Sequence, residues 1–452
     1  MKNVKKLLSI ATVFVGLAVY LGSGRGQGGE PGESYRVVIA GFDGMDPEFL
    51  DYFLSQGKLP HFQKLLREGA YAPCQTFKPT KSVVLWTSVA TGKRMEKHGI
   101  VDWQLLSKDG RKILASGQSR RTEALWNILS KSGKASSIVN WWATWPAEAV
   151  QGAIVSNHFP RSRHEPLEEA TFPPELAAEL ETLGLPDRAA AEAALMAAGI
   201  PVYSREVADS VFRPNSQFHA RFQTAAGVFN DDAIAERSLF HLIDSRGQAP
   251  LSAVLFRTTD VYTHFLWRFI DRRVAEPVYR ALREEGKPLT DEIVKTMDEA
   301  YARVLEPVYV HEDRRLGRLI SKLAPGTVLL VVSDHGFQFR NYGFNHYDDG
   351  RGGVKAPPGI LFLWGPPVRP GGKLQVPTLF DIGPTALYLL GLPVGRDMDG
   401  RVLTEAISAD LLSRRPVAWI ASHDEGSRAG SDRESPVDED VLRELQILGY
   451  VP

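Results

Sequence analysis

Residues 328–332 (VLLVV) form the stretch that most constrains how this chain can fold. The run is short and rich in β-branched residues, and it ends abruptly in the residues SDHG at 333–336. Such a run is typical of a central parallel strand that is covered on both faces. Open α/β sheets bind ligands at the carboxyl ends of these strands. Asp334 and His335 are therefore candidate site residues, with a turn Asp beside a surface His as the alternative.

Two other apolar runs end in the same way. Residues 36–41 (RVVIAG) predict a first core strand, and Asp43 follows it ahead of a helix predicted over about 47–56. Residues 251–257 predict a third core strand, and Asp260 and His264 follow it. On a helix, residues four apart share a face, so both side chains can reach one ion. A plain Asp-Gly turn at Asp43 and a surface hydrogen bond between Asp260 and His264 are the alternatives.

A hydroxyl side chain and a late histidine complete the set. Residues 78–92 (KPTKSVVLWTSVATG) predict a helix that starts after a proline and stops at a glycine. Ser82 would lie in or beside its first turn, where free N–H groups and the helix dipole favour negative charge. A helix cap and a metal-activated nucleophile occupy the same place, so both roles remain open for Ser82. His346 lies in a loop that leads into a further core strand predicted within 356–365.

Composition limits the chemistry of such a site. With 53 basic and 54 acidic residues the net charge is -1, so no nucleic-acid polymer is indicated as a partner. Cys74 is the only cysteine, which excludes an internal disulfide and a thiolate-rich metal site. Three Asp and three His suit Zn²⁺ and also tolerate Mn²⁺ or Fe. Two ions with a hydroxyl between them form a phosphoryl-transfer site.

The chain also divides into segments. Residues 1–34 begin with lysines, continue with about fifteen mostly apolar residues at 7–21, and end in a Gly-rich linker. That run is short for a membrane span and right for a secretory signal, so we expect export to the periplasm or the exterior, with an uncleaved membrane anchor as the alternative. We expect a catalytic domain over 35–412, with an inserted helical cap at 158–250, and a polar, partly disordered tail over 413–452. The tryptophans at 141, 142 and 145 are expected in the core, with a pocket rim as the alternative.

The motifs together resemble the alkaline phosphatase superfamily, and most of all its type I phosphodiesterase/nucleotide pyrophosphatase branch. The resemblance covers about 35–410 without the cap, and it rests on these motifs in order: Asp43, Ser82 ahead of WTS at 86–88 and TG at 91–92, HGI at 98–100, D-x-x-x-H at 260–264, SDHG at 333–336 and His346. It implies a three-layer α/β/α sandwich with a largely parallel central sheet. It also implies two metal ions, one held by Asp43, Ser82, Asp334 and His335, and the other by Asp260, His264 and His346.

The chain departs from the family pattern at two positions. Ser82 stands where similar nucleotide pyrophosphatases carry a threonine nucleophile, and either hydroxyl serves the chemistry. Trp103 stands where they carry an asparagine that binds a phosphate oxygen, which weakens the diesterase assignment. A sulfatase is disfavoured because its nucleophile derives from a cysteine within Cys-x-Pro-x-Arg.

We therefore expect an exported two-metal phosphohydrolase that cleaves phosphodiester or pyrophosphate bonds in small substrates. Ser82 would form a covalent phosphoseryl intermediate, and two divalent ions, Zn²⁺ first, would be the cofactors. The alternatives are a phosphomonoesterase or phosphonate hydrolase of the same superfamily and an envelope phospho-headgroup transferase. A metal-stabilised glycan- or lipid-binding module is a further one, although a binding module needs no nucleophile. Contact with a membrane is expected only if the N-terminal segment stays uncleaved.

Overall fold

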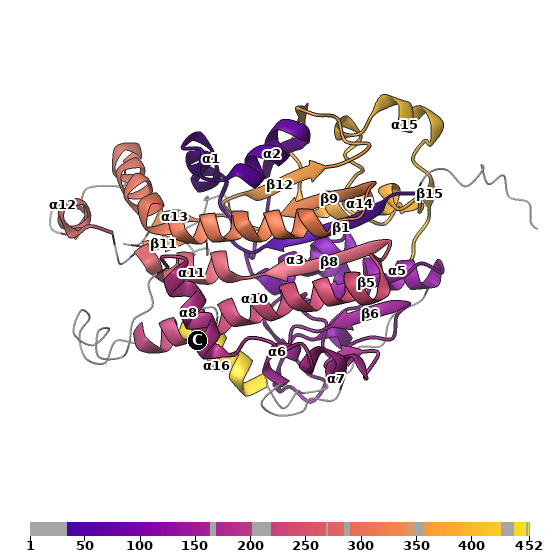
Figure 1. Cartoon of the computed structure of the whole chain (residues 1–452), viewed down its shortest axis with the longest axis horizontal. Helices are drawn as coiled ribbons and strands as arrows, with labels where there is room; N and C mark the ends of the chain where they lie inside the picture. The colour runs from indigo at the N-terminus through magenta and orange to yellow at the C-terminus, as the bar shows by residue number, and fades with distance from the viewer. Residues whose placement is uncertain are drawn as a thin grey trace, which may run out of the picture. The chain divides into compact units, whose positions relative to one another are not determined.

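A nine-stranded sheet lies at the centre of the protein (Figure 1). The computed structural model describes residues 34–162, 169–200, 218–267, 270–283, 290–340, 343–346, 356–425, 438–448 and 451. The strands follow the order β13-β2-β12-β9-β1-β8-β5-β6-β7. At the centre, β1 (Arg36–Phe42) pairs in parallel with both β8 (Leu251–Phe256) and β9 (Thr327–Val332). The three predicted core strands are therefore neighbours, and their carboxyl ends meet at one edge.

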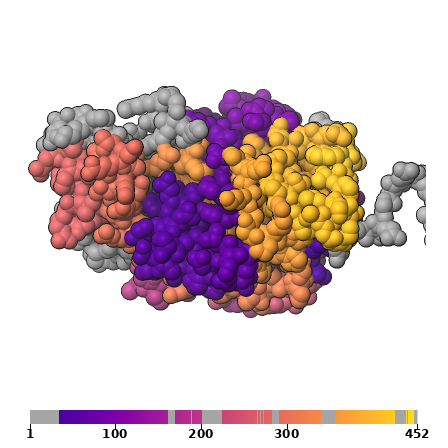
Figure 2. All heavy atoms as spheres, turned by 90° about the horizontal axis from the view of Figure 1, so that it is seen from above, coloured from indigo at the N-terminus to yellow at the C-terminus, as the bar shows by residue number. Residues whose placement is uncertain are grey.

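The outer strands make the sheet mixed but mostly parallel. On one side, β5 (Ser136–Val139) and β6 (Gly152–Val155) continue the parallel set, and the short β7 (Thr171–Phe172) ends it antiparallel. On the other side, β12 (Gly359–Trp364) is antiparallel to both β9 and β2 (Ala70–Cys74), and β13 (Gly372–Lys373) is parallel to β2. Figure 2 shows indigo N-terminal segments beside orange-to-yellow C-terminal segments on one face. The chain enters β12 at the edge where β9 ends.

Helices cover both faces of the sheet, because alternate residues of a strand point to opposite sides. Val38, Ala40 and Phe42 of β1 pack into one apolar cluster, and Val37 and Ile39 pack into the other. The first cluster includes residues of α1 (Pro47–Ser55), α2 (Pro60–Glu68), α10 (Phe218–Arg246), α11 (Thr258–Leu266) and α13 (Asp291–Lys322). The second includes residues of α3 (Ser82–Thr91), α5 (Leu125–Lys131) and α14 (Ile382–Leu389). The three-layer α/β/α sandwich is thus confirmed.

Shorter elements connect these layers. They are α4 (Met95–His98), β3 (Gln104–Leu106), β4 (Lys112–Leu114), α6 (Phe159–Ser162), α7 (Leu176–Glu181), α8 (Arg188–Ala197), α12 (Arg272–Arg283), β10 (Gln338–Arg340), β11 (Gly343–Asn345), β14 (Val394–Gly395), α15 (Ala409–Arg414), β15 (Trp419–Ile420) and α16 (Asp438–Leu448). The three clustered tryptophans, predicted as core, are buried, at 1% exposure for Trp141, 7% for Trp142 and 2% for Trp145.

The region predicted as a cap is in part a sheet-covering layer. Helix α10 lies against β8, β5 and α11, and Figure 1 shows it crossing the face of the sheet beside α13. Helix α8 packs on α10. Residues 218–246 of the predicted insertion therefore form a long flanking helix, because α10 packs buried apolar residues against the sheet. The cap over 158–250 stays a prediction, which α7 and α8 could form, and residues 163–168 and 201–217 of it lie outside the described residues.

The C-terminal segment packs on the domain where the structure describes it, which differs from the expected tail. β15 pairs with β14, and Val441 and Leu445 of α16 are buried. An ion pair of 2.9 Å joins Glu444 of α16 to Arg257 at the end of β8. Two apolar residues four apart are enough to anchor a short helix, and the charged composition around them conceals this pattern.

Truncation of a buried α16 side chain should therefore destabilise the whole domain. We expect Leu445→Ala to lower the free energy of unfolding by roughly 2–5 kcal/mol, because it removes a buried aliphatic side chain and leaves a cavity. Arg443→Ala on the exposed side of α16 is the control, with an expected change within about 0.5 kcal/mol. Thermal and urea unfolding measure both variants. Equal stability of the two would mean that α16 does not contribute to the core in solution.

The predicted export signal and the linker up to Glu33 lie outside the described residues. Within the described ranges, no helix combines the length and the hydropathy that a membrane span needs. Cleavage of the signal and the alternative of a membrane anchor both stay predictions.

Candidate active site

The edge where β1, β8 and β9 end brings the seven predicted site residues together. Each comes from an element end that the sheet or its flanking helices hold in place. All seven are buried, with at most 8% exposure: Asp43 after β1, Ser82 at the start of α3, Asp260 and His264 on α11, Asp334 and His335 after β9, and His346 after β11.

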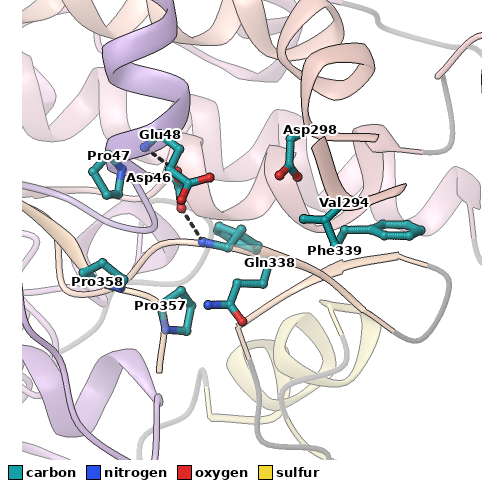
Figure 3. A pocket seen from close by; sticks show the side chains of 10 residues that line it. Asp46, Pro47, Glu48, Val294, Asp298, Gln338, Phe339, Pro357 and Pro358 are labelled. Carbon is teal, nitrogen blue, oxygen red and sulfur yellow. Dashed lines mark hydrogen bonds between the residues drawn. The ribbon is translucent and has the colours of Figure 1, made fainter. Parts of the chain in front are cut away.

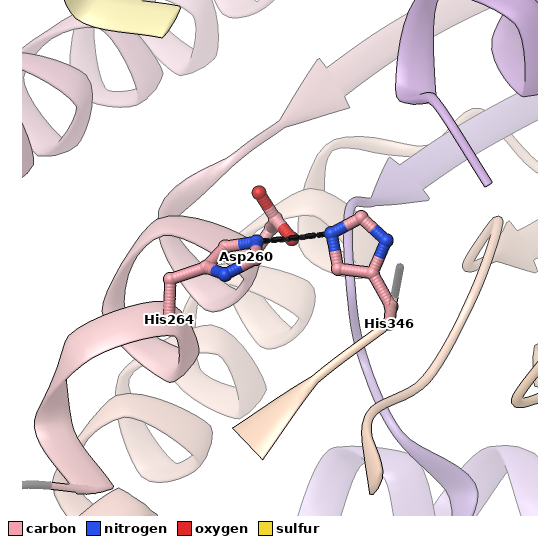
Figure 4. Close-up of side chains that lie close together, drawn as sticks. All are labelled: Asp260, His264 and His346. Atoms are coloured by element: carbon pink, nitrogen blue, oxygen red, sulfur yellow. Dashed lines mark hydrogen bonds and ion pairs between the residues drawn. The ribbon is translucent and has the colours of Figure 1, made fainter. Parts of the chain in front are cut away.

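One group of ligand atoms consists of Asp260, His264 and His346 (Figure 4). The Nε2 atom of His264 lies 3.4 Å from Asp260 Oδ1 and 2.9 Å from His346 Nε2, and the latter lies 3.7 Å from the same carboxylate oxygen. Asp260 and His264 are one turn apart on α11, as predicted. The Thr80 hydroxyl donates a 2.6 Å hydrogen bond to the carbonyl oxygen of His346 and so holds the loop that carries this histidine. Three donor atoms therefore converge on one point.

A second group consists of Asp43, Asp260 and His335, with Asp334 beside it. The Nε2 atom of His335 lies 3.5 Å from Asp43 Oδ1 and 3.7 Å from both Asp260 Oδ1 and Asp334 Oδ2. The Nδ1 atom of His335 lies 3.2 Å from the carbonyl oxygen of Gly336, which makes Nδ1–H a donor and leaves the Nε2 lone pair for a ligand. Asp260 Oδ1 thus lies within reach of both groups.

Ser82 faces the carboxylates and does not cap its helix. The N-cap position of α3 is Lys81, which makes no side-chain capping hydrogen bond, and Ser82 is the first helical residue. The Ser82 hydroxyl donates to Asp43 Oδ1 at 3.2 Å. The geometry therefore argues against the simple cap, while the role of nucleophile stays a prediction.

Burial and like charge dominate the electrostatics of the site. Burial raises the pKa of Asp43 well above its usual range, and the negative charges of Asp334 and Asp260 raise it further. Burial, together with the charge of Asp260, raises the pKa of Asp334 to about 8. Burial lowers the pKa of His346, and the neighbouring imidazoles of His335 and His264 add to this effect. Three carboxylates at one buried edge are costly without a compensating cation, and neutral imidazoles are the form that binds one.

The donor set fits divalent cations. Two buried atoms, Asp334 Oδ2 and His335 Nε2, have no hydrogen-bond partner among the described residues. The His335 atom belongs to the second group and the Asp334 atom lies 3.7 Å from it, so a cation there would satisfy both. The site holds oxygen and nitrogen donors only, since the one cysteine, Cys74, is on β2 and belongs to the apolar core. These ligands suit Zn²⁺, and Mn²⁺ or Fe also accept them.

The raised pKa of Asp334 predicts how pH affects the metal-free protein. Between the ordinary value of 3.8 and about 8, the folded protein keeps a proton that the unfolded chain has released. Rising pH therefore favours the unfolded state across this window, and the melting temperature of chelator-treated protein should fall from pH 5 to pH 8. Asp334→Asn should flatten this slope, and so should bound metal, which stabilises the ionised carboxylate. An equally steep slope in metal-free Asp334→Asn would contradict this attribution.

Two further acids position the site, and the sequence analysis missed both. Asp46 accepts hydrogen bonds from the backbone N–H of Phe337 at 2.8 Å and of Glu48 at 2.8 Å, so it ties the loop after Asp43 to the loop after His335. An Asp directly before Pro47 at a helix start was an available signal for this cap. Asp232 on α10 accepts from the backbone N–H groups of Arg257 and Thr258, both at 2.8 Å, and so fixes the start of α11. No local signal marks Asp232, because its partners lie on another element.

A cavity of about 290 Å³ lies beside the site (Figure 3). Asp46, Glu48 and Asp298 contribute carboxylates to its lining, and Phe339, Pro357 and Pro358 are among its apolar walls. Phe337 lines the cavity too, and its ring centroid lies 5.0 Å from that of His264. Burial raises the pKa of both Asp46 and Asp298 to about 7. An anionic group in this cavity would meet several carboxylates.

Comparison with known proteins places the sequence and the fold. The family model described as type I phosphodiesterase/nucleotide pyrophosphatase matches residues 37–348. A variant of the alkaline phosphatase PafA is 11% identical, with a TM-score of 0.51 over 83% of this chain and 99% of that chain. This similarity confirms the alkaline phosphatase-like fold.

Other solved structures resemble the chain at lower scores. Human ectonucleotide pyrophosphatase/phosphodiesterase 5 is 12% identical, with a TM-score of 0.48 over 83% of this chain and 100% of that chain. The phosphonate monoester hydrolase SpPMH from Silicibacter pomeroyi is 14% identical, with a TM-score of 0.45 over 83% of this chain and 78% of that chain. No curated protein matches the chain in a sequence comparison.

Proposed function

Because the chain belongs to the type I phosphodiesterase/nucleotide pyrophosphatase family, a branch of the alkaline phosphatase superfamily of hydrolases, we propose that it cleaves phosphodiester or pyrophosphate bonds in small substrates. We propose further that it acts outside the cytoplasm, with Ser82 as nucleophile and two divalent ions. The observation that carries the mechanism is the position of Ser82. Its hydroxyl contacts Asp43, which belongs to one group of ligand atoms, and that group shares Asp260 with the other.

We propose the division of ligands that the family resemblance implies, with Asp260 within reach of both groups. Asp43, Ser82, Asp334 and His335 would hold one ion, and Asp260, His264 and His346 would hold the other. When bound, two such ions supply Lewis-acid stabilisation of the negative charge that develops on the attacking and leaving oxygens. Asp260 Oδ1 lies 3.4–3.7 Å from three imidazole nitrogens, so Asp260 would help to hold an ion at either group.

The residues of the chain then perform two displacements. The Ser82 hydrogen is directed at Asp43 Oδ1, which leaves the oxygen lone pairs available for attack. Attack forms the bond from Ser82 Oγ to phosphorus and breaks the bond from phosphorus to the leaving oxygen, and the proton that Ser82 loses departs with that oxygen as an alcohol or a phosphate. Water then attacks the phosphoseryl group, so that Ser82 regains its hydroxyl and the phosphate product is released. The position of Ser82 at the start of α3 also places developing negative charge at the favourable end of the helix.

A phosphomonoesterase or phosphonate hydrolase is the second candidate, and Trp103 favours it. Similar pyrophosphatases carry an asparagine at this position to bind a phosphate oxygen. Trp103 is 3% exposed here, and its ring packs edge-on against Trp142 with centroids 4.9 Å apart. This aromatic contact provides no amide for a phosphate oxygen, so the selection between diester and monoester must come from other residues.

One experiment tests the proposal and separates the two candidates. The purified protein is analysed for bound metal, and the turnover of a nitrophenyl monoester is measured beside that of a bis-nitrophenyl diester. We expect close to two transition-metal ions per chain and faster turnover of the diester. Faster turnover of the monoester would favour the second candidate, and no turnover of either by the metal-loaded protein would contradict the proposed hydrolase. N-terminal sequencing of the mature protein tests export, since cleavage within residues 22–34 is expected.

A further inference from the structure

Trp86 contacts the same carboxylate as Ser82, from the same helix. It lies one turn after Ser82 on α3, so both side chains share a face. The Trp86 indole N–H donates to Asp43 Oδ2 at 3.1 Å, while the Ser82 hydroxyl donates to Asp43 Oδ1 at 3.2 Å. Helix α3 therefore engages both oxygens of one proposed metal ligand.

The surrounding core fixes the Trp86 ring. The side chain is fully buried, and the Trp141 ring packs edge-on against it with centroids 5.1 Å apart. Trp141 also donates its indole N–H to the Trp86 carbonyl oxygen at 3.1 Å. On the strand side, a Cβ atom at Gly41 would lie 2.7 Å from the Trp86 ring, so only a glycine allows the ring to pack this close to β1. These contacts thus hold the indole nitrogen within hydrogen-bond distance of Asp43 Oδ2.

A fixed donor at Oδ2 has a definite chemical effect. A carboxylate can turn about its Cβ–Cγ bond, which changes the oxygen that faces a ligand. An indole N–H only donates and carries no charge, so it can hold Oδ2 without competing for a cation. Asp43 Oδ1 is then the oxygen that faces Ser82 Oγ at 3.2 Å and His335 Nε2 at 3.5 Å. Outer partners of this kind orient metal ligands and tune their affinity.

We propose that Trp86 is a positioning residue of the active site. Its N–H holds Asp43 with Oδ1 toward Ser82 and His335, and this sets both the affinity for a divalent cation and the alignment of Ser82. The inference rests on the proposed function, because it requires a cation at Asp43. If Trp86 served only for packing, a ring of the same shape without the N–H would do equally well.

The test replaces only that N–H group. Incorporation of benzothienylalanine at position 86 keeps the bicyclic ring and exchanges the N–H for sulfur. The same replacement at Trp126 is the matched control, because the Trp126 N–H also donates to a partly buried carboxylate, Glu148 at 2.7 Å, away from the site. Zn²⁺ affinity is measured by competition with a chelator on the full chain, together with kcat, KM and the melting temperature.

We expect the position-86 analogue to bind Zn²⁺ about 10- to 100-fold more weakly, with kcat reduced and part of it restored by excess Zn²⁺. The position-126 analogue should keep Zn²⁺ affinity and kcat within about twofold of the unmodified protein. Unchanged Zn²⁺ affinity and kcat in the position-86 analogue would overturn the inference. If the unmodified protein bound no Zn²⁺ or had no hydrolytic activity, the proposed function itself would fail, which is a distinguishable outcome.

A measurement on the unmodified protein covers the case in which the position-86 analogue does not fold. The indole N–H proton of Trp86, followed by nuclear magnetic resonance during Zn²⁺ titration, should shift in step with binding of an ion, because its acceptor carboxylate becomes a ligand. The indole proton of Trp126 should not shift. A Trp86 proton that stays in place through full Zn²⁺ loading would exclude the coupling.

Discussion

Ser82→Ala should lower kcat on the order of several powers of ten, because it removes the oxygen that attacks phosphorus. The melting temperature should change little, since Ser82 does not cap α3. Bound metal should fall only in part, because Asp43, Asp334 and His335 remain for that ion. Measurement of kcat, metal content and thermal unfolding on the same preparation separates these effects.

Two companion variants make the result specific. Ser82→Thr should retain appreciable activity, since the similar enzymes use threonine in this role. Ser88→Ala is the control on the same helix, because Ser88 is buried and its hydroxyl bonds to His98 at 2.9 Å, away from the carboxylates. Ser88→Ala should keep kcat within a few-fold and affect stability instead. A fully active Ser82→Ala enzyme would remove the covalent mechanism.

Asp260→Asn is expected to have the second large effect, through both metal ions. Asp260 Oδ1 lies near the Nε2 atoms of His264, His335 and His346, so this one carboxylate belongs to both groups. Loss of its charge should reduce metal content from about two ions to fewer than one and lower kcat by about three powers of ten or more. In the metal-free state above about pH 8, where Asp334 is ionised as well, the same change should raise the melting temperature, because it removes a like charge beside that buried carboxylate.

The prediction is specific because Asp260→Asn should lower metal content and kcat but raise the melting temperature of the metal-free protein. Asp298→Asn is the matched control, since Asp298 is a half-buried carboxylate that lines the neighbouring cavity and belongs to neither ligand group. It should leave metal content and kcat close to those of the unmodified protein. An Asp260→Asn enzyme that keeps two ions, or a metal-free form that melts lower, would contradict a shared ligand at this position.

Local sequence patterns predicted the centre of the fold and five of the seven candidate site residues, Asp43, Asp260, His264, Asp334 and His335, for one physical reason. A buried parallel strand needs a short continuous apolar run, and three such runs ended in acids. Parallel neighbours place their carboxyl ends at one edge, so Asp43, Asp260 and Asp334 had to meet once the strands were recognised. The ligand roles of these residues follow from the family resemblance and stay to be tested.

Long-range packing decided what the sequence could not predict. Buried Asp231, Asp232 and Glu236 interrupt the apolar side of helix α10, and only its neighbours β8, β5 and α11 show that it covers the sheet. The hydrogen bonds that Trp86 donates to Asp43 and that Thr258 donates to Asp232 join residues on different elements, which no periodic pattern records. The C-terminal helix was expected as part of a tail because two buried apolar residues are few among many charged ones.

The order of strands in the sheet also determines how much of the chain must be available before the active site can form. The first strand made, β1, lies between β8 and β9, which leave the ribosome only after most of the chain has been translated. Asp43 and Ser82 therefore lack the other site residues until the chain up to His346 has been synthesised. Pairing over such long sequence separations is slow. Nascent chains cut short before β9 should have neither the central sheet nor any affinity for a cation at its edge.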